Sequence, residues 1–325
     1  MCAFRLCRAL FHRQSGNPTP LHFTAGRTIT QDAGSGRPVI ARIIDRRINP
    51  KYESMFAVGV DEMSWDDLDE RHYDWPTRQH GRKVLMLAGC VQPAMLPNIN
   101  VATARVLDAC GFEVVRVPQA GCCGAVKFHL NDHDGGKAQM RANIDAWWPH
   151  IEAGAQAIVM NASGCGVTVK DYGHLLRDDP AYADKARRVS ELTRDLSEFL
   201  PEIADALQGT VQERARAMGT LAYHPPCTLQ HGQQLKGGVE QHLRALGFTL
   251  RVAANESHLC CGSAGTYSVL NPDISYTLRD RKLGHLDALT PSAILSANVG
   301  CITHLQSGTD VPVKHWVEVL DAALN

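Results

Sequence analysis

The feature that most constrains this 325-residue chain is a duplicated pattern of cysteines. Four cysteines recur in the same order with offsets of 136 to 138 residues, and their surroundings recur too, as in GCCGA and LCCGSAG. Self-similarity at a fixed spacing indicates copies of one structural unit. We therefore expect two units, at residues 81–210 and 211–325, behind a poorly structured leader and linker at residues 1–80. The repeated pairs are Cys90 and Cys227, Cys122 and Cys260, Cys123 and Cys261, and Cys165 and Cys301.

Each unit alternates short apolar runs with longer stretches of helical spacing. Strands that alternate with helices favour parallel sheets joined by right-handed crossovers. The predicted fold is therefore α/β, with two tandem units that each hold a small parallel sheet flanked by helices. The expected strands are Lys83–Ala88, Glu113–Val117, Ala157–Met160, Leu221–His224, Thr249–Val252 and Ala293–Ser296, and the main helices are Asn98–Cys110, Gly135–Gly154, Gly238–Leu246 and Pro272–Leu289.

The repeated cysteines all follow expected strands. In the first unit, Cys90 and Cys165 come shortly after one strand each, and Cys122 and Cys123 lie in the loop after another. Ligands of open α/β sheets gather at the carboxyl ends of the strands. Glycines flank these cysteines, and glycine lets a backbone approach a bulky centre closely. Three loops of one unit are therefore expected to bring its four thiols together.

Converging thiols can hold zinc, hold an iron–sulfur cluster or perform dithiol–disulfide chemistry. The chain has 11 cysteines and no evident secretion signal, which argues against a disulfide framework. Neighbouring cysteines point apart in extended backbone, so the pair at 122 and 123 favours an extended multi-iron centre over one tetrahedral ion. Cys110 has no partner in the repeat, and we interpret it as a core residue.

Several longer stretches carry a family resemblance. They include LAGCVQPAMLPNINVATARVLDACG at 87–111, AGCCGAVKFHLN at 120–131, HPPCTLQH at 224–231 and HLCCGSAGTY at 258–267. These stretches resemble the cysteine-rich CCG domain of the heterodisulfide reductase B subunit, and in particular the C-terminal half of the bacterial glycolate oxidase iron–sulfur subunit. The resemblance covers about residues 80–325.

The resemblance implies an iron–sulfur electron-transfer subunit of an oxidoreductase that oxidises glycolate, a 2-hydroxy acid. A flavin-containing partner subunit would perform the hydride chemistry, and electrons would pass to a quinone or other acceptor. The implied cofactor is a cluster of the [4Fe–4S] type. The implied location is cytoplasmic, with peripheral association with the membrane electron-transport chain at the inner membrane face. The implied metal ligands are Cys90, Cys122, Cys123, Cys165, Cys227, Cys260, Cys261 and Cys301.

The chain departs from the family pattern in two ways. Proteins of that family begin with a ferredoxin module, whereas the first 80 residues here hold only Cys2 and Cys7. Family motifs also end in C-x-x-C, whereas this chain has Thr168 and His304 at the last position. A fifth thiolate is therefore in doubt in both units, and zinc is an alternative metal. His304 is a candidate nitrogen ligand in the second unit.

Other features limit the remaining function classes. His224 and His231 bracket Cys227, and they either support or bind the metal or simply pack in a turn. The sequence has no G-x-G-x-x-G fingerprint or phosphate loop, so no flavin or NAD site is expected in this chain. Lys and Arg number 33 against 34 acidic residues, which argues against a nucleic-acid partner. Two alternative functions are a zinc-bound or metal-free docking module and a stand-alone CCG-type thiol–disulfide reductase.

Overall fold

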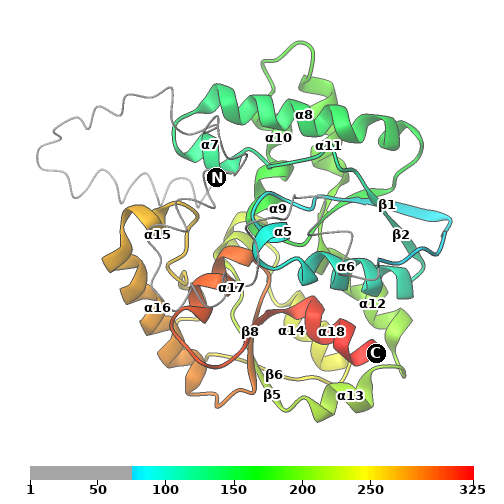
Figure 1. Ribbon diagram of the computed structural model, residues 1–325. Coiled ribbons are helices and arrows are strands. Elements are labelled where there is room, and N and C mark those ends of the chain that lie inside the picture. Colours follow the sequence, from blue (N-terminus) through cyan, green and yellow to red (C-terminus); the bar gives the residue numbers. More distant parts are fainter. Residues whose placement is uncertain (1–74) are drawn as a thin grey trace, which may run out of the picture. The chain divides into compact units, whose positions relative to one another are not determined.

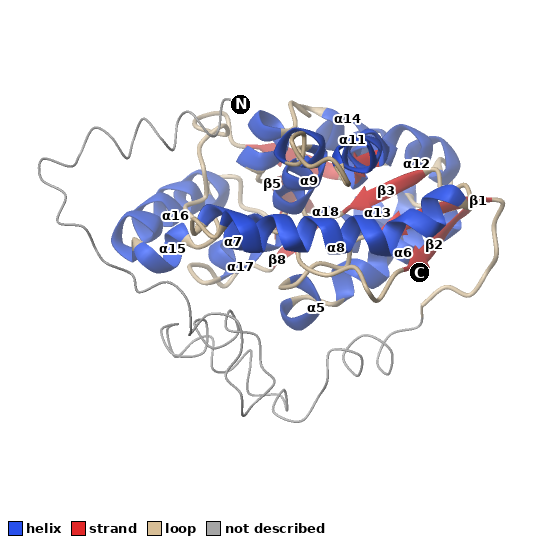
Figure 2. Ribbon diagram, turned by 90° about the horizontal axis from the view of Figure 1, so that it is seen from above, coloured by secondary structure: helices blue, strands red, loops and turns tan. Residues whose placement is uncertain are grey.

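Two four-stranded parallel sheets form the framework of residues 75–325, the part described by this computed structural model (Figures 1 and 2). The strand orders are β2-β1-β3-β4 and β6-β5-β7-β8, so the second sheet repeats the topology of the first. This confirms the predicted α/β fold with two repeated units. The expectation for the leader and linker covers residues 1–80, of which residues 1–74 lie outside the described part of the chain. The strands are β1 (Arg82–Met86), β2 (Phe112–Arg116), β3 (Ala157–Met160), β4 (Thr193–Asp195), β5 (Thr220–Tyr223), β6 (Thr249–Val252), β7 (Ala293–Ser296) and β8 (Val313–His315).

The two sheets are in equivalent register. Val84 of β1 pairs with Ala157 of β3, and Leu221 of β5 pairs with Ala293 of β7. The central strands β1, β3, β5 and β7 end in residues that are almost all buried, because helices cover both faces of each sheet. Equivalent register means that residues following β1 and β5 occupy equivalent places beside their sheets.

Helices connect the strands of the first unit and cover its sheet. The 20-residue helix α8 begins after Asp132, whose carboxylate accepts a hydrogen bond from the backbone N–H of Gly135 at 2.9 Å. The helical elements are α5 (Gln92–Met95), α6 (Asn98–Ala109), α7 (Ala125–His129), α8 (His133–Glu152), α9 (Ser163–Lys170), α10 (Tyr172–Leu175), α11 (Ala183–Leu192), the 3-10 turn η2 (Leu196–Phe199) and α12 (Leu200–Leu207).

The second unit uses the same plan with different lengths. Pro272 opens α16, where the missing N–H of proline costs nothing. Each unit also ends its last strand in a capping box, formed by Asp195 and Glu198 in the first and by His315 and Glu318 in the second. The helical elements are α13 (Gln212–Ala217), the π-helical turn η3 (Thr228–Gly232), α14 (Gly238–Ala245), α15 (Tyr267–Leu270), α16 (Pro272–Asp287), α17 (Val299–Gln306) and α18 (Trp316–Leu324).

The last helix of each unit packs on the first long helix of the other. Helix α18 contacts α6, and α12 contacts α14. The guanidinium Nε of Arg105 on α6 donates to the Asp321 carboxylate on α18 at 2.9 and 3.1 Å. One continuous apolar core also includes buried residues from both units, such as Val84 and Leu221. The two units are therefore held together by packed helices as well as by the chain between them.

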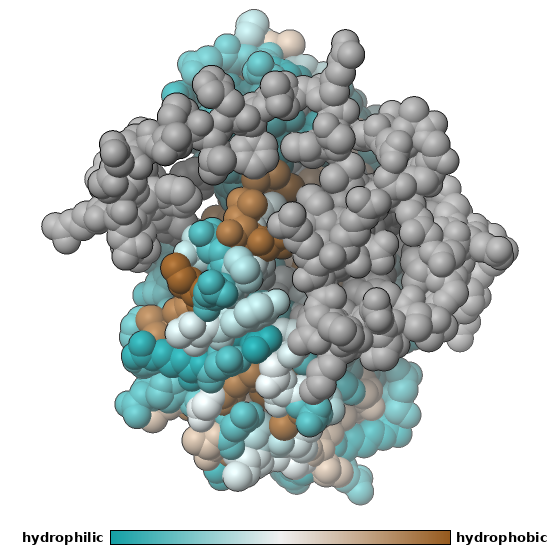
Figure 3. Space-filling model, turned by 60° about the vertical axis from the view of Figure 1, so that its left-hand side comes forward, coloured by the Kyte–Doolittle hydropathy of each residue, from teal (hydrophilic) through white to brown (hydrophobic). Residues whose placement is uncertain are grey.

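The described surface is mostly polar. Its exposed large hydrophobic side chains are Leu130, Leu270, Ile274 and Tyr276, three of which lie on α15 and α16. Figure 3 turns the side that carries these two helices forward and shows brown, apolar residues among teal, polar ones. Among residues 75–325, no helix combines the length and apolar character needed to span a bilayer.

Candidate metal centre

The four repeated cysteines of the first unit lie close together at the carboxyl end of their sheet. Cys90 follows β1, Cys122 and Cys123 follow β2, and Cys165 lies in the first turn of α9, after β3. Cys122 interacts with Cys123 and Cys90, and these interactions lower the pKa of Cys122 to about 3. Cys123 in turn interacts with Cys165. All four are free cysteines, so the arrangement is a contiguous thiol cluster without a disulfide.

The second unit forms an equivalent cluster. Cys260 interacts with Cys227 and Cys261, and these interactions lower the pKa of Cys260 to about 2. The backbone N–H of Gly262 also donates to the Cys260 sulfur at 3.3 Å. Cys261 also interacts with Cys301, and this interaction lowers the pKa of Cys301 to about 6. The thiolate form is thus stabilised by neighbouring groups at Cys122 in the first cluster and at Cys260 and Cys301 in the second, which suits metal ligands.

The glycine after each cysteine pair permits a close approach between loop and helix. Gly124 has φ 91° and Gly262 has φ 95°, both in the left-handed region. A Cβ atom on Gly124 would lie 2.7 Å from the carbonyl oxygen of Gly136 on α8. On Gly262 it would lie 2.3 Å from the carbonyl oxygen of Ser275 on α16. Only glycine fits at these positions, and both loops are thereby seated on a helix.

Buried polar side chains hold the first cysteine loop in place. Asn143 on α8 accepts from the N–H of Gly121 at 2.8 Å and donates to the carbonyl of Cys122 at 2.9 Å. The hydroxyl of Tyr172 donates to the carbonyl of Cys123 at 2.8 Å. These bonds satisfy backbone groups that the loop would otherwise leave unpaired. The positions of both cysteines are therefore set by the surrounding fold.

Different side chains hold the second cysteine loop. The hydroxyl of Ser275 on α16 donates to the carbonyl of Gly262 at 2.8 Å. Lys282 lies further along α16 and is 2 % exposed. Its amino group donates to the carbonyl of Glu256, just before the loop. Burial lowers the pKa of Lys282, and the nearby Cys261 and Cys260 oppose this shift. A buried amino group thus lies beside the second cluster.

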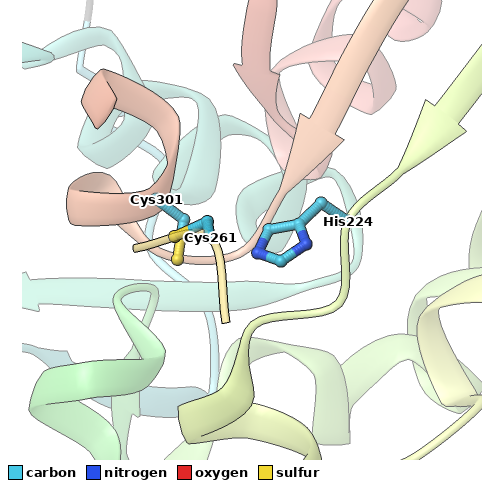
Figure 4. A group of neighbouring side chains, drawn as sticks. All are labelled: His224, Cys261 and Cys301. Carbon is cyan, nitrogen blue, oxygen red and sulfur yellow. The ribbon is translucent and has the colours of Figure 1, made fainter. Parts of the chain in front are cut away.

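His224 belongs to the second cluster in space. It directly follows β5, is 1 % exposed, and lies with Cys261 and Cys301 so that one ligand atom of each is within 4.8 Å of the others. Figure 4 shows the imidazole ring facing these two cysteines. Neither ring nitrogen has a hydrogen-bond partner in the described structure. The trio offers two sulfur atoms and one nitrogen atom to a metal.

His304 lies on the helix side of the same cluster and has other partners. Its Nε2 is 3.0 Å from the hydroxyl of Ser275 and 3.2 Å from the carbonyl oxygen of that residue. Its ring stacks on Tyr276 with 6.0 Å between the centroids, and burial lowers its pKa. The role of His304 as a metal ligand stays a prediction.

The two clusters are linked by hydrogen bonds across the units. The side-chain oxygen of Asn298 accepts from the backbone N–H of Gly164, and its NH₂ group donates to the sulfur of Cys301 at 3.7 Å. The N–H of Ser163 donates to the carbonyl of Ala297 at 3.0 Å, and its hydroxyl lies 2.7 Å from that of Thr228. The loops that carry Cys165 and Cys301 therefore face each other.

Comparison with known protein families gives the same two units. The model of the CCG family, described as "Cysteine-rich domain", matches residues 84–170 and 221–306, which together make up more than half of the chain. Each match contains one complete four-cysteine set. This chain belongs to the cysteine-rich CCG domain family.

Curated relatives with the same CCG region include two iron–sulfur subunits. The "Glycolate oxidase iron-sulfur subunit" of Escherichia coli (strain K12) is 53% identical over 249 residues, which cover 77% of this chain and 60% of the relative. The "Probable glycolate oxidase iron-sulfur subunit" of Bacillus subtilis (strain 168) is 28% identical over 267 residues, covering 81% and 59%. The chain therefore spans about three fifths of the length of these relatives.

A third relative is covered almost completely. "Lactate utilization protein A" of Bacillus licheniformis is 26% identical over 253 residues, which cover 74% of this chain and 99% of that protein. Relatives with different printed names thus each match about three quarters of this chain. The domain boundaries expected at 81–210 and 211–325 stay predictions.

The predicted ligands of the CCG domains are brought together in two groups of four, one in each unit. Cys110 stands apart from both: it packs against the apolar core, and burial raises its pKa to about 12. Cys2 and Cys7 lie outside the described residues. From the sequence, the role of His224 stayed open between metal support and turn packing. Nothing in the sequence pointed to Asn298 or Lys282, whose partners lie elsewhere along the chain.

Proposed function

We propose that this chain is an iron–sulfur electron-transfer subunit of a complex that oxidises glycolate or a related 2-hydroxy acid. In this proposal it accepts electrons from a flavin-containing partner subunit and passes them to a quinone or another acceptor. The supporting observation is the pair of four-thiol clusters, placed at equivalent points of two sheets and linked through Asn298. The printed names of the two glycolate oxidase relatives support the same reading.

In this proposal the eight repeated cysteines hold the metal. The donor chemistry fits an iron–sulfur group, because soft thiolates are the usual ligands of such clusters and each set already contains a stabilised thiolate. The adjacent cysteines present sulfurs from one loop while the other two thiols come from separate loops. A cluster of the [4Fe–4S] type would supply reversible one-electron transfer. The protein supplies the thiolates, the N–H donor of Gly262 and the buried surroundings.

Zinc is a second candidate for the first unit. Thr168, at the last position of the family motif, donates its hydroxyl hydrogen to the carbonyl oxygen of Gly164 at 3.2 Å within α9. Its oxygen is therefore engaged in the helix, and four thiols remain as donors. Four cysteine ligands are a common set for structural zinc. In that case the first unit would brace the complex while the second carried electrons.

The proposed setting is the cytoplasm, with peripheral association at the inner membrane face. Nine described cysteines are free thiols, which agrees with a reducing compartment. A quinone acceptor would require approach to the membrane surface. Fractionation of cells, with salt washes of the membranes, tests this part of the proposal, and a salt-resistant membrane fraction would contradict it.

Co-expression of the full chain with a flavin-containing glycolate oxidase subunit tests the proposed function. The two proteins should co-purify under anaerobic conditions, and glycolate should bleach the visible thiolate-to-iron absorption of the chain. A variant that carries both Cys260→Ser and Cys261→Ser should lose much of this response. A complex whose iron absorption is unchanged by glycolate would contradict electron transfer from the partner.

A further inference from the structure

The buried imidazole of His224 lacks the partners that buried polar groups normally have. The side chain is 1 % exposed, and both ring nitrogens are without a hydrogen-bond partner in the described structure. A buried polar atom without a partner destabilises the folded state. The backbone of His224 is well satisfied, because its N–H donates to Leu295 at 2.8 Å and its carbonyl accepts from Ser296. Among the described residues the ring interacts only with thiols, so a further partner would complete its bonding.

The thiols beside the ring show where this partner would lie. The ring of His224 lies beside Cys260 and Cys301 and interacts with both. With Cys261, these are three of the four thiols of the second cluster. The ring nitrogens and the sulfur atoms of Cys261 and Cys301 are near enough to share one metal atom (Figure 4).

The first unit has an apolar residue at the same place. Sheet register makes Leu87 the equivalent of His224, because each directly follows its strand and donates its N–H to the next strand along, at Val159 and Leu295. Leu87 is 3 % exposed and shares an apolar cluster with Cys123. The fold therefore accommodates a leucine here, and the histidine of the second unit is not required for packing.

We propose that His224 is a nitrogen ligand of the metal centre held by Cys227, Cys260, Cys261 and Cys301, so that the two units hold chemically different centres. This inference rests on the proposed function, because it requires that the second thiol set binds metal. A neutral imidazole is a common ligand for iron and zinc. Metal binding would occupy one ring nitrogen and leave only the other to find a partner.

The buried polar side chains beside the two clusters also differ. Asn143 and Lys282 occupy equivalent buried positions on α8 and α16, so a neutral amide in the first unit is replaced by an amino group in the second. Positive charge near a metal centre favours its reduced form. The second centre is therefore the one expected to have the more positive reduction potential, which places it later in the path of electrons.

His304 is the competing nitrogen ligand, and the structure separates the two histidines. His304 Nε2 already has Ser275 as a partner, whereas the His224 nitrogens have none. His304 Nε2 also lies against the Gly262 loop, since a Cβ on Gly262 would be 3.1 Å from it. One experiment can therefore assign the nitrogen ligand.

The test uses the full chain with the first site removed by Cys122→Ser and Cys123→Ser, prepared anaerobically. Elemental analysis identifies the bound metal, and X-ray absorption at its edge then counts imidazole ligands. We expect one imidazole in this parent, its loss with His224→Leu, and its retention with His304→Leu. His224→Cys keeps a ligating side chain, so it should retain metal with an added sulfur and no imidazole.

The outcomes separate the inference from the function on which it rests. A parent without any metal contradicts the proposed function of the second site. A parent that binds metal without an imidazole contradicts only the assignment of His224. Imidazole that persists in His224→Leu or His224→Cys, or that disappears in His304→Leu, also overturns the assignment. A folded His224→Leu variant that has lost its metal supports it, because the first unit shows that leucine fits this position.

Discussion

Asn298 accepts a hydrogen bond from the backbone N–H of Gly164 at 3.1 Å, across a separation of 134 residues. Gly164 lies beside Cys165 of the first cluster, and the amide of Asn298 also donates to Cys301 of the second. A single side chain thus joins the loops of both clusters. The thiol clusters of the two units are therefore linked through this side chain.

Replacing Asn298 should weaken this link. We expect Asn298→Ala to lower the free energy of unfolding by about 1–2 kcal/mol, because the N–H of Gly164 loses its partner in a partly buried place. Urea unfolding of the anaerobic protein measures the change. The control Gln241→Ala changes an exposed side chain on α14 and should stay within about 0.5 kcal/mol of the parent. Equal free energies for both variants would contradict a structural link.

The glycine after the second cysteine pair offers a sharper contrast. Gly262→Ala should cost several kcal/mol and reduce metal binding, since the new Cβ would meet the Ser275 carbonyl and φ is 95°. Gly284→Ala, on α16 in open space, should raise stability by up to about 1 kcal/mol. Thermal unfolding and metal content measure both. A stable, metal-loaded Gly262→Ala variant would show that the loop does not need its close approach.

Much of the fold could be predicted from the repeat and from local pattern. Three strands have the predicted bounds, because short apolar runs are typical of buried parallel strands. They are Ala157–Met160, Thr249–Val252 and Ala293–Ser296. The main helices end within two residues of their expected bounds. The convergence of each cysteine set followed from strand ends meeting at one edge of a sheet.

The remaining features depend on contacts that local pattern does not carry. Strand β4 is three residues long and reads TRD, so no apolar run marks it. Cys165 and Cys301 lie in the first turns of the short helices α9 and α17, where the sequence indicated only a position after a strand. The partners of Asn298 and Lys282 are set by the packing of distant elements. His224 was recognisable as a neighbour of Cys227, but its missing partners are visible only in three dimensions.

Lys282 should influence the second centre through its charge. Lys282→Met removes a buried amino group beside Cys260 and Cys261. We expect the reduction potential of the second centre to become more negative by on the order of 60 mV, which is a tenfold change for a one-electron couple. Redox titration followed by electron paramagnetic resonance measures it. Lys236→Met, at an exposed position, is the control, and equal potentials in the two variants would contradict the role of the charge.

His315 should make stability depend on pH. Burial lowers its pKa to about 3 in the folded chain, against about 6.5 when unfolded. Between these values the unfolded state binds a proton that the folded state does not, so stability is lost as the pH falls below about 6.5, by up to about 1.4 kcal/mol per pH unit.

The variant His315→Asn isolates this effect. Asparagine can still accept from the N–H of Val317, as the Nδ1 of His315 does at 3.1 Å, so the cap of α18 is kept. Urea unfolding at pH 7.5 and 5.5 should show a pH-dependent loss that is about 1 kcal/mol smaller in the variant than in the parent. The same loss in both proteins would mean that His315 is not buried in its neutral form.

The most direct test of the account is the iron and acid-labile sulfide content of anaerobically purified chain, compared across three variants. The parent should contain both elements in two centres. The Cys122→Ser, Cys123→Ser chain and the Cys260→Ser, Cys261→Ser chain should each lose one centre and keep the other. Cys110→Ser should match the parent, because the Cys110 thiol is affected by burial and by Glu202 but by none of the repeated thiols. A folded parent chain that contains neither iron nor sulfide would contradict the central claim.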